Sequence, residues 1–555
     1  MPNVRRPIVL TALPILLIVM LSVVDAAEYH VAVQNPTASD RNRGSLEQPW
    51  KSISKANKTV KPGDVVHIHA GVYRERIEPL ADGKDSAPII YAAFAGDDVQ
   101  LGENPEHKAC INLRGRSFIR VKGIKITDPG NNYPAYARMV GAQHCVLEDC
   151  DFSGAVKYYH GVLIGNELPG RSSSYNTLRN VTLKGVPGDI ILIRGDAHHN
   201  LFVRCYLSDI GASKSHAMVM IHGLRPKGKV PHHNAFIDCE ISPVHHSGVD
   251  MAGGTHHNLF DRCVFRNAAP DGNAVQMPVS DNIFRRCLVI NNRGHQGGAN
   301  NTFSMYTARD QWFEEGGYFT YSTAVRNHIY NNTFTGNLGF AISCDYWPSA
   351  EHSFPLRIGD NKFVNNVFAF NGTRRGGLEI FYNEGTGKIS GDVWSHNLLG
   401  ADGRAQVMSW GGMNYTLLDC LRRIVEITFA ANIQEDPLFK DRKSGDYGLQ
   451  DGSPCIDAGG ALTHTTSAGE GTSIPVLDSG FFCDGFGIID GDMVVVAGNP
   501  PVKVVKIPDA THLVVEKAIS WKAADPVSLP YSGNAPDIGA VEYKSKGQRS
   551  EEDGR

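Results

Sequence analysis

The sequence predicts an all-β protein whose main body is a right-handed parallel β-helix, a solenoid of stacked coils. Three observations predict this fold. A short block recurs along the middle of the chain, its apolar residues alternate with polar ones instead of following helical spacing, and its small residues recur at matching positions. Hydrophobic residues make up 42% and charged residues 20% of the chain, which is typical of a folded domain and argues against wholesale disorder.

The recurring block reads HHNLFVRCYL from His198, HHNAFIDCEI from His232 and HHNLFDRCVF from His256. Its asparagine recurs at Asn176, Asn200, Asn234, Asn258, Asn282, Asn327 and Asn361, so the base step is 24 residues with insertions in some copies. At about 3.3 Å per strand residue, three short strands and three turns fill about 24 residues, which is one coil of a parallel β-helix. We expect the asparagines to form a ladder that bonds each turn to the next coil.

The cysteines follow the same spacing. Five residues after the asparagine position, which is occupied by Cys145 in the first block, stand Cys150, Val181, Cys205, Cys239, Cys263 and Cys287. Consecutive coils stack about 4.8 Å apart, so this column predicts an inward ladder of buried, reduced thiols. The chain has no C-x-x-C pair of the kind that metal sites prefer. The paired histidines beside the asparagines could be zinc ligands, but their recurrence at one turn favours a structural turn position.

The chain divides into five parts. Residues 1–26 are expected to be a signal peptide, because Arg5 and Arg6 precede an apolar run that ends before Ala26-Ala27. This predicts a secreted, periplasmic or cell-surface protein that has no membrane contact after cleavage. Residues 27–467 are expected to be the β-helix with an N-terminal helical cap, 468–531 an inserted small β module, 532–543 a closing strand and 544–555 a disordered tail. The formal charge of -4 gives no reason to expect nucleic-acid binding, and a monomer is expected.

Both ends of the predicted solenoid carry recognisable motifs. The opening contains Tyr29, Gly44, Pro49-Trp50-Lys51-Ser52-Ile53, Gly63-Asp64 and Gly71-Val72-Tyr73, and the far end contains DGSPCIDAG from Asp451 and DIGAVEY from Asp537. These motifs resemble the opening and closing segments of bacterial secreted β-helix proteins of the pectate-lyase-like superfamily. The resemblance implies the fold, export and a polysaccharide partner, but it identifies no single reaction.

The strand before each asparagine block is expected to present polar side chains outward. One predicted outward column is Leu163, Leu192, Val219, Asp250, Gln276, Ser304, Ser343 and Glu379, and the next is Gly165, Arg194, Ile221, Ala252, Pro278, Tyr306, Asp345 and Phe381. The longest insertions follow this strand, and insertions on one side of a solenoid usually build its binding face. Their cations and aromatic residues suit an acidic sugar chain, because cations hold uronate groups and aromatic faces stack on sugar rings.

Three functions fit this predicted face. The first is a polysaccharide lyase that cleaves uronate-containing glycans by β-elimination, with Ca²⁺ as the expected cofactor if a metal neutralises the uronate in place of arginine. The second is a glycoside hydrolase that uses Asp345 and Glu379 as its carboxylate pair. The third is a non-catalytic glycan-binding or surface protein. The candidate catalytic residues are His246, Asp250, Tyr306, Asp345 and Glu379. The candidate substrate-binding residues are Arg194, His222, Arg225, Lys227, Gln276, Arg309 and Trp347.

Overall fold

The fold was analysed in a computed structural model. It describes residues 26–102, 109–128, 135–153, 160–165, 168, 170–186, 188–210, 217–223, 229–242, 247–267, 272–293, 301–307, 323–346, 357–383, 389–401 and 406–544. The predicted signal peptide, apart from Ala26, and nearly all of the predicted tail lie outside these ranges. Within them, no helix combines the length and the hydropathy that crossing a membrane requires.

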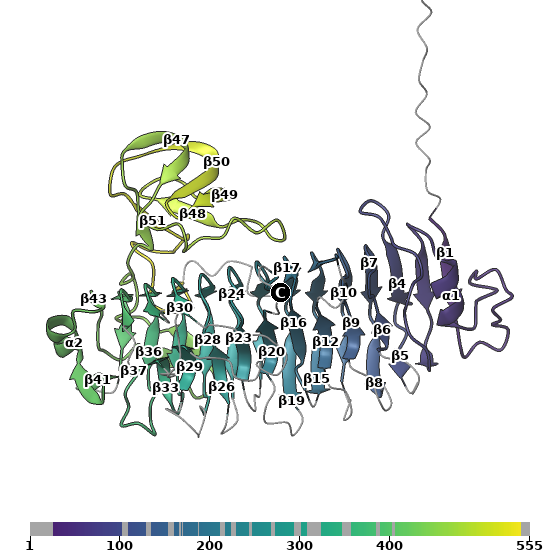
Figure 1. The fold of residues 1–555 in the computed structure, drawn as a ribbon, viewed down its shortest axis with the longest axis horizontal. Coiled ribbons are helices and arrows are strands. Elements are labelled where there is room, and N and C mark those ends of the chain that lie inside the picture. The colour runs from purple at the N-terminus through teal and green to yellow at the C-terminus, as the bar shows by residue number, and fades with distance from the viewer. Residues whose placement is uncertain are drawn as a thin grey trace, which may run out of the picture.

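The main body is a right-handed parallel β-helix with three long sheets, as the repeat predicts (Figure 1). Sheet A consists of β1 (Glu28–Val31), β2 (Val65–Ile68), β4 (Ile89–Ala93), β7 (Ile119–Lys122), β10 (Val146–Glu148), β14 (Thr177–Arg179), β18 (Leu201–Val203), β21 (Ala235–Ile237), β24 (Leu259–Asp261), β27 (Ile283–Arg285), β31 (His328–Tyr330), β35 (Lys362–Val364), β39 (Val393–Ser395) and β43 (Thr428–Ala430).

Sheet B consists of β3 (Gly71–Tyr73), β5 (Val99–Gly102), β8 (Lys125–Asp128), β11 (Asp151–Phe152), β15 (Thr182–Val186), β19 (Tyr206–Ile210), β22 (Glu240–Ile241), β25 (Val264–Arg266), β28 (Leu288–Ile290), β32 (Thr333–Thr335), β36 (Val367–Ala369) and β40 (Leu398–Leu399). Sheet C consists of β6 (Ile111–Asn112), β9 (Ala135–Arg138), β12 (His160–Ile164), β16 (Ile191–Arg194), β20 (Ala217–His222), β23 (Ser247–Ala252), β26 (Asn273–Gln276), β29 (Asn301–Thr307), β33 (Phe340–Tyr346), β37 (Ile380–Asn383), β41 (Gln406–Trp410) and β42 (Met413–Thr416).

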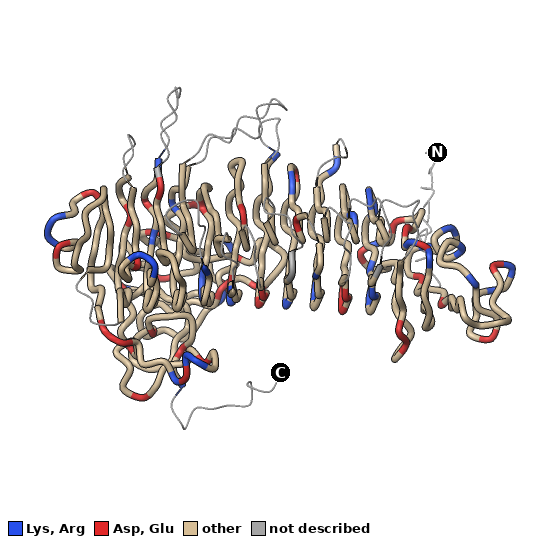
Figure 2. Tube along the Cα trace, turned by 90° about the horizontal axis from the view of Figure 1, so that it is seen from below, with Lys and Arg blue, Asp and Glu red and all other residues tan. Residues whose placement is uncertain are grey.

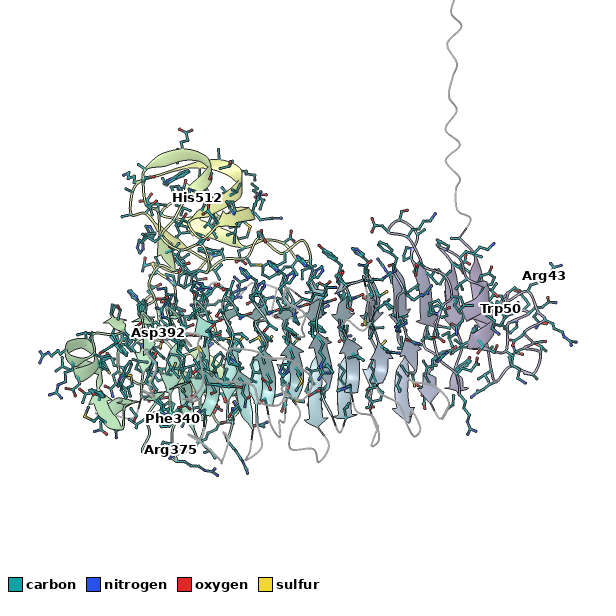
Figure 3. All side chains as sticks on the ribbon, in the orientation of Figure 1. Arg43, Trp50, Phe340, Arg375, Asp392 and His512 are labelled. Atoms are coloured by element: carbon teal, nitrogen blue, oxygen red, sulfur yellow. The ribbon has the colours of Figure 1, made fainter. Side chains whose placement is uncertain are left out.

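Short strands extend the turns and the C-terminal end of the solenoid. They are β13 (Ser173–Ser174), β17 (Ala197–His198), β30 (Ala324–Val325), β34 (Ile358–Gly359), β38 (Ile389–Ser390), β44 (Phe439–Asp441) and β45 (Asp446–Leu449). The helix α1 (Ile53–Thr59) covers the N-terminal coil as expected. It begins after Ser52, whose hydroxyl accepts a hydrogen bond from the Lys55 N–H. Trp50 lies just before it, buried at that end of the molecule (Figure 3). The second helix, α2 (Leu417–Arg423), lies at the opposite end.

Side-chain ladders inside the turns hold neighbouring coils in register. The Asn200 carboxamide oxygen accepts from both the N–H and the Nδ2 of Asn176, at 3.1 and 3.0 Å, and Asn234 repeats this arrangement toward Asn200. Each of these groups is buried, so the ladder satisfies turn N–H groups that would otherwise lack a partner. The predicted asparagine ladder is confirmed.

The predicted cysteine ladder is also confirmed. All of its thiols are buried in the solenoid core and none is in a disulfide, and the Cys263 N–H lies 3.4 Å from Cys287 Sγ on the next coil. Beyond Cys287 the same column continues as a second asparagine ladder through Asn332, Asn366, Asn397 and Asn432. The second histidine of each pair occupies a left-handed turn position, with φ of 55°, 53° and 53° at His199, His233 and His257. These histidines therefore occupy structural turn positions.

The C-terminal module is a small antiparallel β domain placed against the C-terminal half of sheet A (Figure 1). Its strands run in the order β46 (Thr463–His464), β51 (Pro526–Ser528), β48 (Met493–Val496), β49 (Val502–Asp509), β50 (His512–Trp521) and β47 (Gly469–Pro475). The closing motifs on either side of it meet, because the Asp457 N–H donates to Asp537 Oδ1 at 2.8 Å and the Ile538 N–H donates to the Cys455 carbonyl at 2.9 Å. The module is therefore inserted between two adjacent segments.

Candidate functional site

The polar residues that the sequence placed on one face lie on the outer surface of sheet C. In the strand register, Asp250 is opposite Gln276, Gln276 is opposite Ser304, and Ser304 is opposite Ser343. Tyr306 is opposite Asp345 in the next outward column. Their neighbours along each strand, such as Val249 and Met251, belong to the buried core. Strand alternation therefore directs the four candidate site residues outward, namely Asp250, Gln276, Tyr306 and Asp345.

The predicted columns are wrong at two strands, and the cause is the same in both. In β20 the outward residues are Met220 and His222, rather than Val219 and Ile221. In β37 they are Phe381 and Asn383, rather than Glu379 and Phe381. Met220 and Phe381 are apolar but face outward: Met220 packs on an outer cluster with Leu163 and Leu192, and Phe381 stacks on Phe340 with ring centroids 4.8 Å apart. Treating apolar residues as inward therefore shifted the alignment.

Glu379 does not lie on the outward face, so its assignment as a surface carboxylate is wrong. Its side chain is 1% exposed and accepts from Asn371 Nδ2 at 2.7 Å. Asn371 is the last asparagine of a turn ladder that runs from Asn292 through Asn337. Glu379 thus ends that ladder, and the proposed Asp345–Glu379 carboxylate pair is absent because Asp345 lies opposite Asn383.

A compact cluster forms where β16, β20 and β23 adjoin. Arg194 is opposite His222 in the strand register, and His222 Nε2 lies 3.6 Å from Asp250 Oδ1. The side chains of His222 and Asp250 are 9% and 13% exposed, so the pair is largely shielded from water. The Arg194 Nε is buried and makes no hydrogen bond to the residues that the structure describes. The cluster therefore places a guanidinium, an imidazole and a carboxylate on three successive coils.

Tyr306 and Asp345 form a second group on the same face. Asp345 is 6% exposed and accepts from Asn301 Nδ2 at 3.1 Å. Burial raises the pKa of Asp345, although hydrogen bonds from Asn301 and Asn383 oppose the shift. Three coil steps separate Asp250 from Asp345, or about 14 Å at the usual strand spacing. A glycoside hydrolase needs its two carboxyl groups about 5–9.5 Å apart, so these two do not form such a pair.

Five of the predicted residues lie outside the described ranges: His246, Arg225, Lys227, Arg309 and Trp347. Their roles stay predictions. Among the described residues, no group of three or more His, Cys, Asp or Glu side chains is arranged to hold a metal ion. Positive and negative residues are interspersed along the solenoid (Figure 2).

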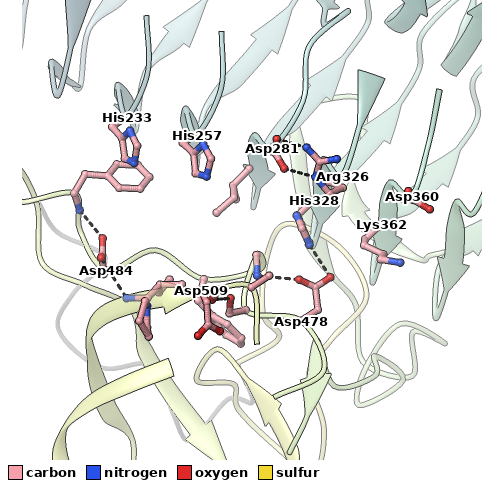
Figure 4. A pocket seen from close by; sticks show the side chains of 18 residues that line it. His233, His257, Asp281, Arg326, His328, Asp360, Lys362, Asp478, Asp484 and Asp509 are labelled. Carbon is pink, nitrogen blue, oxygen red and sulfur yellow. Dashed lines mark hydrogen bonds and ion pairs between the residues drawn. The ribbon is translucent and has the colours of Figure 1, made fainter. Parts of the chain in front are cut away.

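Sequence reasoning missed a cavity of about 610 Å³ between sheet A and the C-terminal module (Figure 4). It is lined by turn residues of successive coils and by two segments of the module around Asp478–Phe486 and Ile507–Ala510. A signal was present in the turn column that carries His233 and His257, because the same position becomes Asp281, Arg326 and Asp360 on the next coils. The charged side chains that replace the imidazoles at this position all line the cavity.

The chain is therefore a right-handed parallel β-helix protein with a polar outer face on one sheet and an inserted β module. A family model described as the right handed beta helix region matches residues 230–420. The uncharacterized protein YwoF of Bacillus subtilis (strain 168) is 28% identical over 99 residues, which are 17% of this chain and 21% of that protein. The match thus spans about a fifth of the relative.

Several solved structures match much of this chain at low sequence identity. XylC, solved in complex with xylose, is 14% identical over 90% of this chain and 99% of that chain, with a TM-score of 0.41. Pectate lyase Pel9A is 14% identical over 93% and 96%, with a TM-score of 0.42. The PL6 family polysaccharide lyase Pedsa3628 from Pseudopedobacter saltans is 14% identical over 69% and 91%, with a TM-score of 0.44. Similarity at this level concerns the fold and assigns neither a reaction nor a residue to this chain.

Proposed function

We propose that the protein is an exported polysaccharide lyase that cleaves an acidic glycan on the outer face of sheet C. The observation that carries this proposal is the Arg194–His222–Asp250 cluster, in which His222 Nε2 lies 3.6 Å from Asp250 Oδ1 and Arg194 stands opposite His222. β-Elimination at a uronate needs a cation for the carboxylate and a base for the proton on the adjacent carbon. In the cluster, Arg194 is the candidate cation and His222 the candidate base, and they lie opposite each other on adjacent strands.

The roles follow from the chemistry of each group. Arg194 would bind the uronate carboxylate and thereby acidify the neighbouring C5 proton. His222 would accept that proton while the C4–O bond breaks and a C4=C5 double bond forms. The resulting imidazolium could return the proton to the leaving oxygen, and Asp250 would orient and stabilise it. Tyr306 and Asp345, further along the same face, would contact neighbouring sugar units.

The hydrolase alternative lacks support from the described residues, because Glu379 is committed to a turn ladder and Asp250 and Asp345 are too far apart. A non-catalytic binder would use the same face without turnover. Export rests on the N-terminal sequence, where Arg5 and Arg6 precede the apolar run.

The decisive experiment incubates the mature protein with uronate-containing and neutral polysaccharides, with added Ca²⁺ or with chelator. A lyase produces new ultraviolet absorbance from the unsaturated product. We expect His222→Gln to lower kcat by a factor of about 10²–10⁴ and Arg194→Ala to weaken turnover of the acidic substrate by a similar factor. Arg179→Ala, on the outer face of sheet A, is the matched control and should leave turnover unchanged.

Other outcomes would reject the proposal. New reducing ends without absorbance would indicate a hydrolase, and retention of a glycan with neither signal would indicate a binder. Full activity of both cluster variants would place the chemistry elsewhere on the chain.

A further inference from the structure

The cavity between the C-terminal module and the solenoid lies on sheet A (Figure 4). The Arg194–His222–Asp250 cluster lies on sheet C, which is a different face of the solenoid. The cavity volume of about 610 Å³ is within the range of small-ligand sites, about 300–1,000 Å³. The cavity is separate from the neighbouring packed interface between sheet A and the module. In that interface, outward residues of sheet A such as Leu259 and Ala235 pack into the core of the module.

Two imidazole rings form one wall. His233 and His257 stack with ring centroids 5.0 Å apart, and the Phe486 ring meets His233 edge-on at 4.8 Å. The Nδ1 atoms of His233 and His257 each form a hydrogen bond of 2.7 Å with the Nδ1 atom of the preceding histidine, His232 or His256. Burial and the neighbouring imidazoles lower the pKa of His233 to about 3, so this ring is neutral at physiological pH. The wall is therefore a flat, uncharged surface with ring nitrogens.

Two pairs of polar side chains that line the cavity bond to each other. Arg326 forms two hydrogen bonds to Asp281, both at 2.7 Å, and His328 Nε2 lies 3.0 Å from Asp478 Oδ2. Such pairs still offer their remaining lone pairs and N–H groups as hydrogen-bond partners. Burial alone would raise the pKa of Asp478, but hydrogen bonds from His328 and the Gly480 N–H, together with the charge of Lys362, lower it.

The module supplies an apolar surface opposite these groups. Phe482, Phe486, Ile507 and Pro508 line the cavity from this side. The carboxylates in the lining, Asp281, Asp360, Asp478, Asp484 and Asp509, outnumber its full cations, Arg326 and Lys362. An anionic ligand would therefore meet net repulsion. A ligand that fits needs many hydroxyl groups, apolar C–H faces and no negative charge.

We propose that this cavity is a binding site for neutral saccharide units. Sugar hydroxyls would bond to the paired carboxylates, the histidine ring nitrogens and Lys362, while the C–H faces of the pyranose rings would lie on Phe482 and Phe486. The site would hold a neutral glycan segment by the joint action of the solenoid and the module. It is independent of the reaction proposed for the sheet C face, which favours acidic sugars.

The test measures binding of single oligosaccharides to the full mature protein by calorimetry. The probes are xylotetraose, cellotetraose, mannotetraose and N-acetylchitotetraose, with tetragalacturonate as the acidic comparison. We expect at least one neutral probe to bind, and Lys362→Ala and Phe486→Asn each to weaken its affinity at least tenfold. Asn is chosen because Phe486 has φ of 52°, which Asn tolerates. Lys503→Ala is the matched control and should not change the affinity, because Lys503 is a partly exposed lysine of the module that pairs with Asp490 outside the cavity lining.

Arg194→Ala separates this inference from the proposed reaction. It should remove elimination activity on acidic glycans and leave binding of the neutral probe intact. Failure of every neutral probe to bind, or binding that Arg194→Ala abolishes and Lys362→Ala leaves unchanged, would overturn the inference without touching the lyase proposal. Preferential binding of tetragalacturonate that depends on Lys362 would overturn the ligand class. If Phe486→Asn fails to fold, Lys362→Ala decides the result alone.

Discussion

The outer face of sheet A has opposite chemistry in its two halves, although the backbone repeat is the same. In the N-terminal half, strands β7, β10 and β14 present Arg120, Lys122, Glu148 and Arg179, all partly or fully exposed. In the C-terminal half, the equivalent positions are Leu201, Ala235, Ile237, Leu259 and Ile283, each at most 7% exposed beneath the module. Inward and turn residues therefore determine the coil, while outward residues can vary to match solvent or the domain that covers them.

The covered half also contains a buried charge network that the bare half lacks. Arg285 bonds to Asp492 of the module at 2.6 and 2.7 Å, and to Asp261 of the neighbouring strand at 3.2 Å. Tyr330 donates its hydroxyl to the Phe481 carbonyl. The contacts with Asp492 and Phe481 join residues 207 and 151 positions apart in sequence, so they fix where the module sits.

Removing the module should give the largest effect. Replacing residues 461–530 with a short Gly/Ser linker exposes the apolar stripe of β18, β21, β24 and β27, and an exposed apolar patch of this kind promotes association. We expect the shortened protein to aggregate, as measured by size-exclusion chromatography with light scattering. Changing Leu201, Leu259 and Ile283 to Thr in the same protein should restore solubility. A soluble deletion with no further change would show that the two halves do not differ as described.

Cutting the charge network should have the next largest effect. Arg285→Ala leaves the buried Asp492 without its arginine partner and removes one of the three arginines that pair with Asp261. Breaking a buried charge pair in this way typically costs about 3–5 kcal/mol. The measurements are the free energy of unfolding in urea and the rate of proteolysis at the segments that join the module to the solenoid. The control in the bare half is Arg179→Ala, whose contact with Glu148 spans 3.8 Å at the surface and should contribute less than about 0.5 kcal/mol. Equal losses for the two variants would contradict the comparison.

The same network predicts an acid dependence. Burial alone would raise the pKa of Asp261, but Arg285 and Arg286 outweigh it and hold the pKa at about 2. Because this folded-state pKa lies below the unfolded value, the stabilisation is present above about pH 4 and is lost as the pH falls through about 2. It amounts to about 2 kcal/mol. Unfolding free energies measured from pH 7 to pH 2 should show this loss in the wild type, and Asp261→Asn should lack it. If the free energy of unfolding of Asp261→Asn fell with decreasing pH as steeply as that of the wild type, the charge network would not be the cause of the acid dependence.

A pH effect of opposite sign comes from the core. Asp392 ends the first asparagine ladder by accepting from Asn361 Nδ2 at 3.0 Å and from the Tyr382 hydroxyl at 2.8 Å (Figure 3). Burial raises its pKa to about 6, so its contribution is most favourable below about pH 4 and declines as the pH rises through 6. Asp392→Asn keeps the ladder acceptor, and we expect it to be at least as stable as the wild type at pH 7. Urea unfolding at pH 4 and pH 7 measures this, and a marked loss at pH 7 would contradict it.

The smallest effect is expected in the histidine turns. His257 has φ of 53°, a conformation that Asn adopts readily and β-branched residues do not. His257→Asn should change the free energy of unfolding by less than about 1 kcal/mol, and His257→Val should cost about 1–2 kcal/mol. Neither should alter turnover on an acidic glycan. A loss of turnover in well-folded His257→Asn would give this turn a part in the chemistry.

Residues that repeat along the chain could be located from the sequence, and single residues that break the repeat could not. The Asn176 to Asn361 column and the Cys205 to Cys287 column were readable because each coil imposes the same spacing. The shared face of Asp250, Gln276, Tyr306 and Asp345 followed from strand alternation. Glu379 was misplaced because outward Phe381 looked like a core residue. His222 was chosen from its strand, but its contact with Asp250 depends on the register between β20 and β23.

Strand alternation and turn chemistry are local and repeat with each coil, so the β-helix, its ladders and a separate β module could all be predicted from the sequence. Which outward residues meet depends instead on tertiary structure. Arg194, His222 and Asp250 come together through stacking of three coils, and the cavity exists because the module docks through Arg285 and Asp492. Such contacts depend on inter-strand register and on domain placement, which arise from many weak interactions between residues that are distant in sequence.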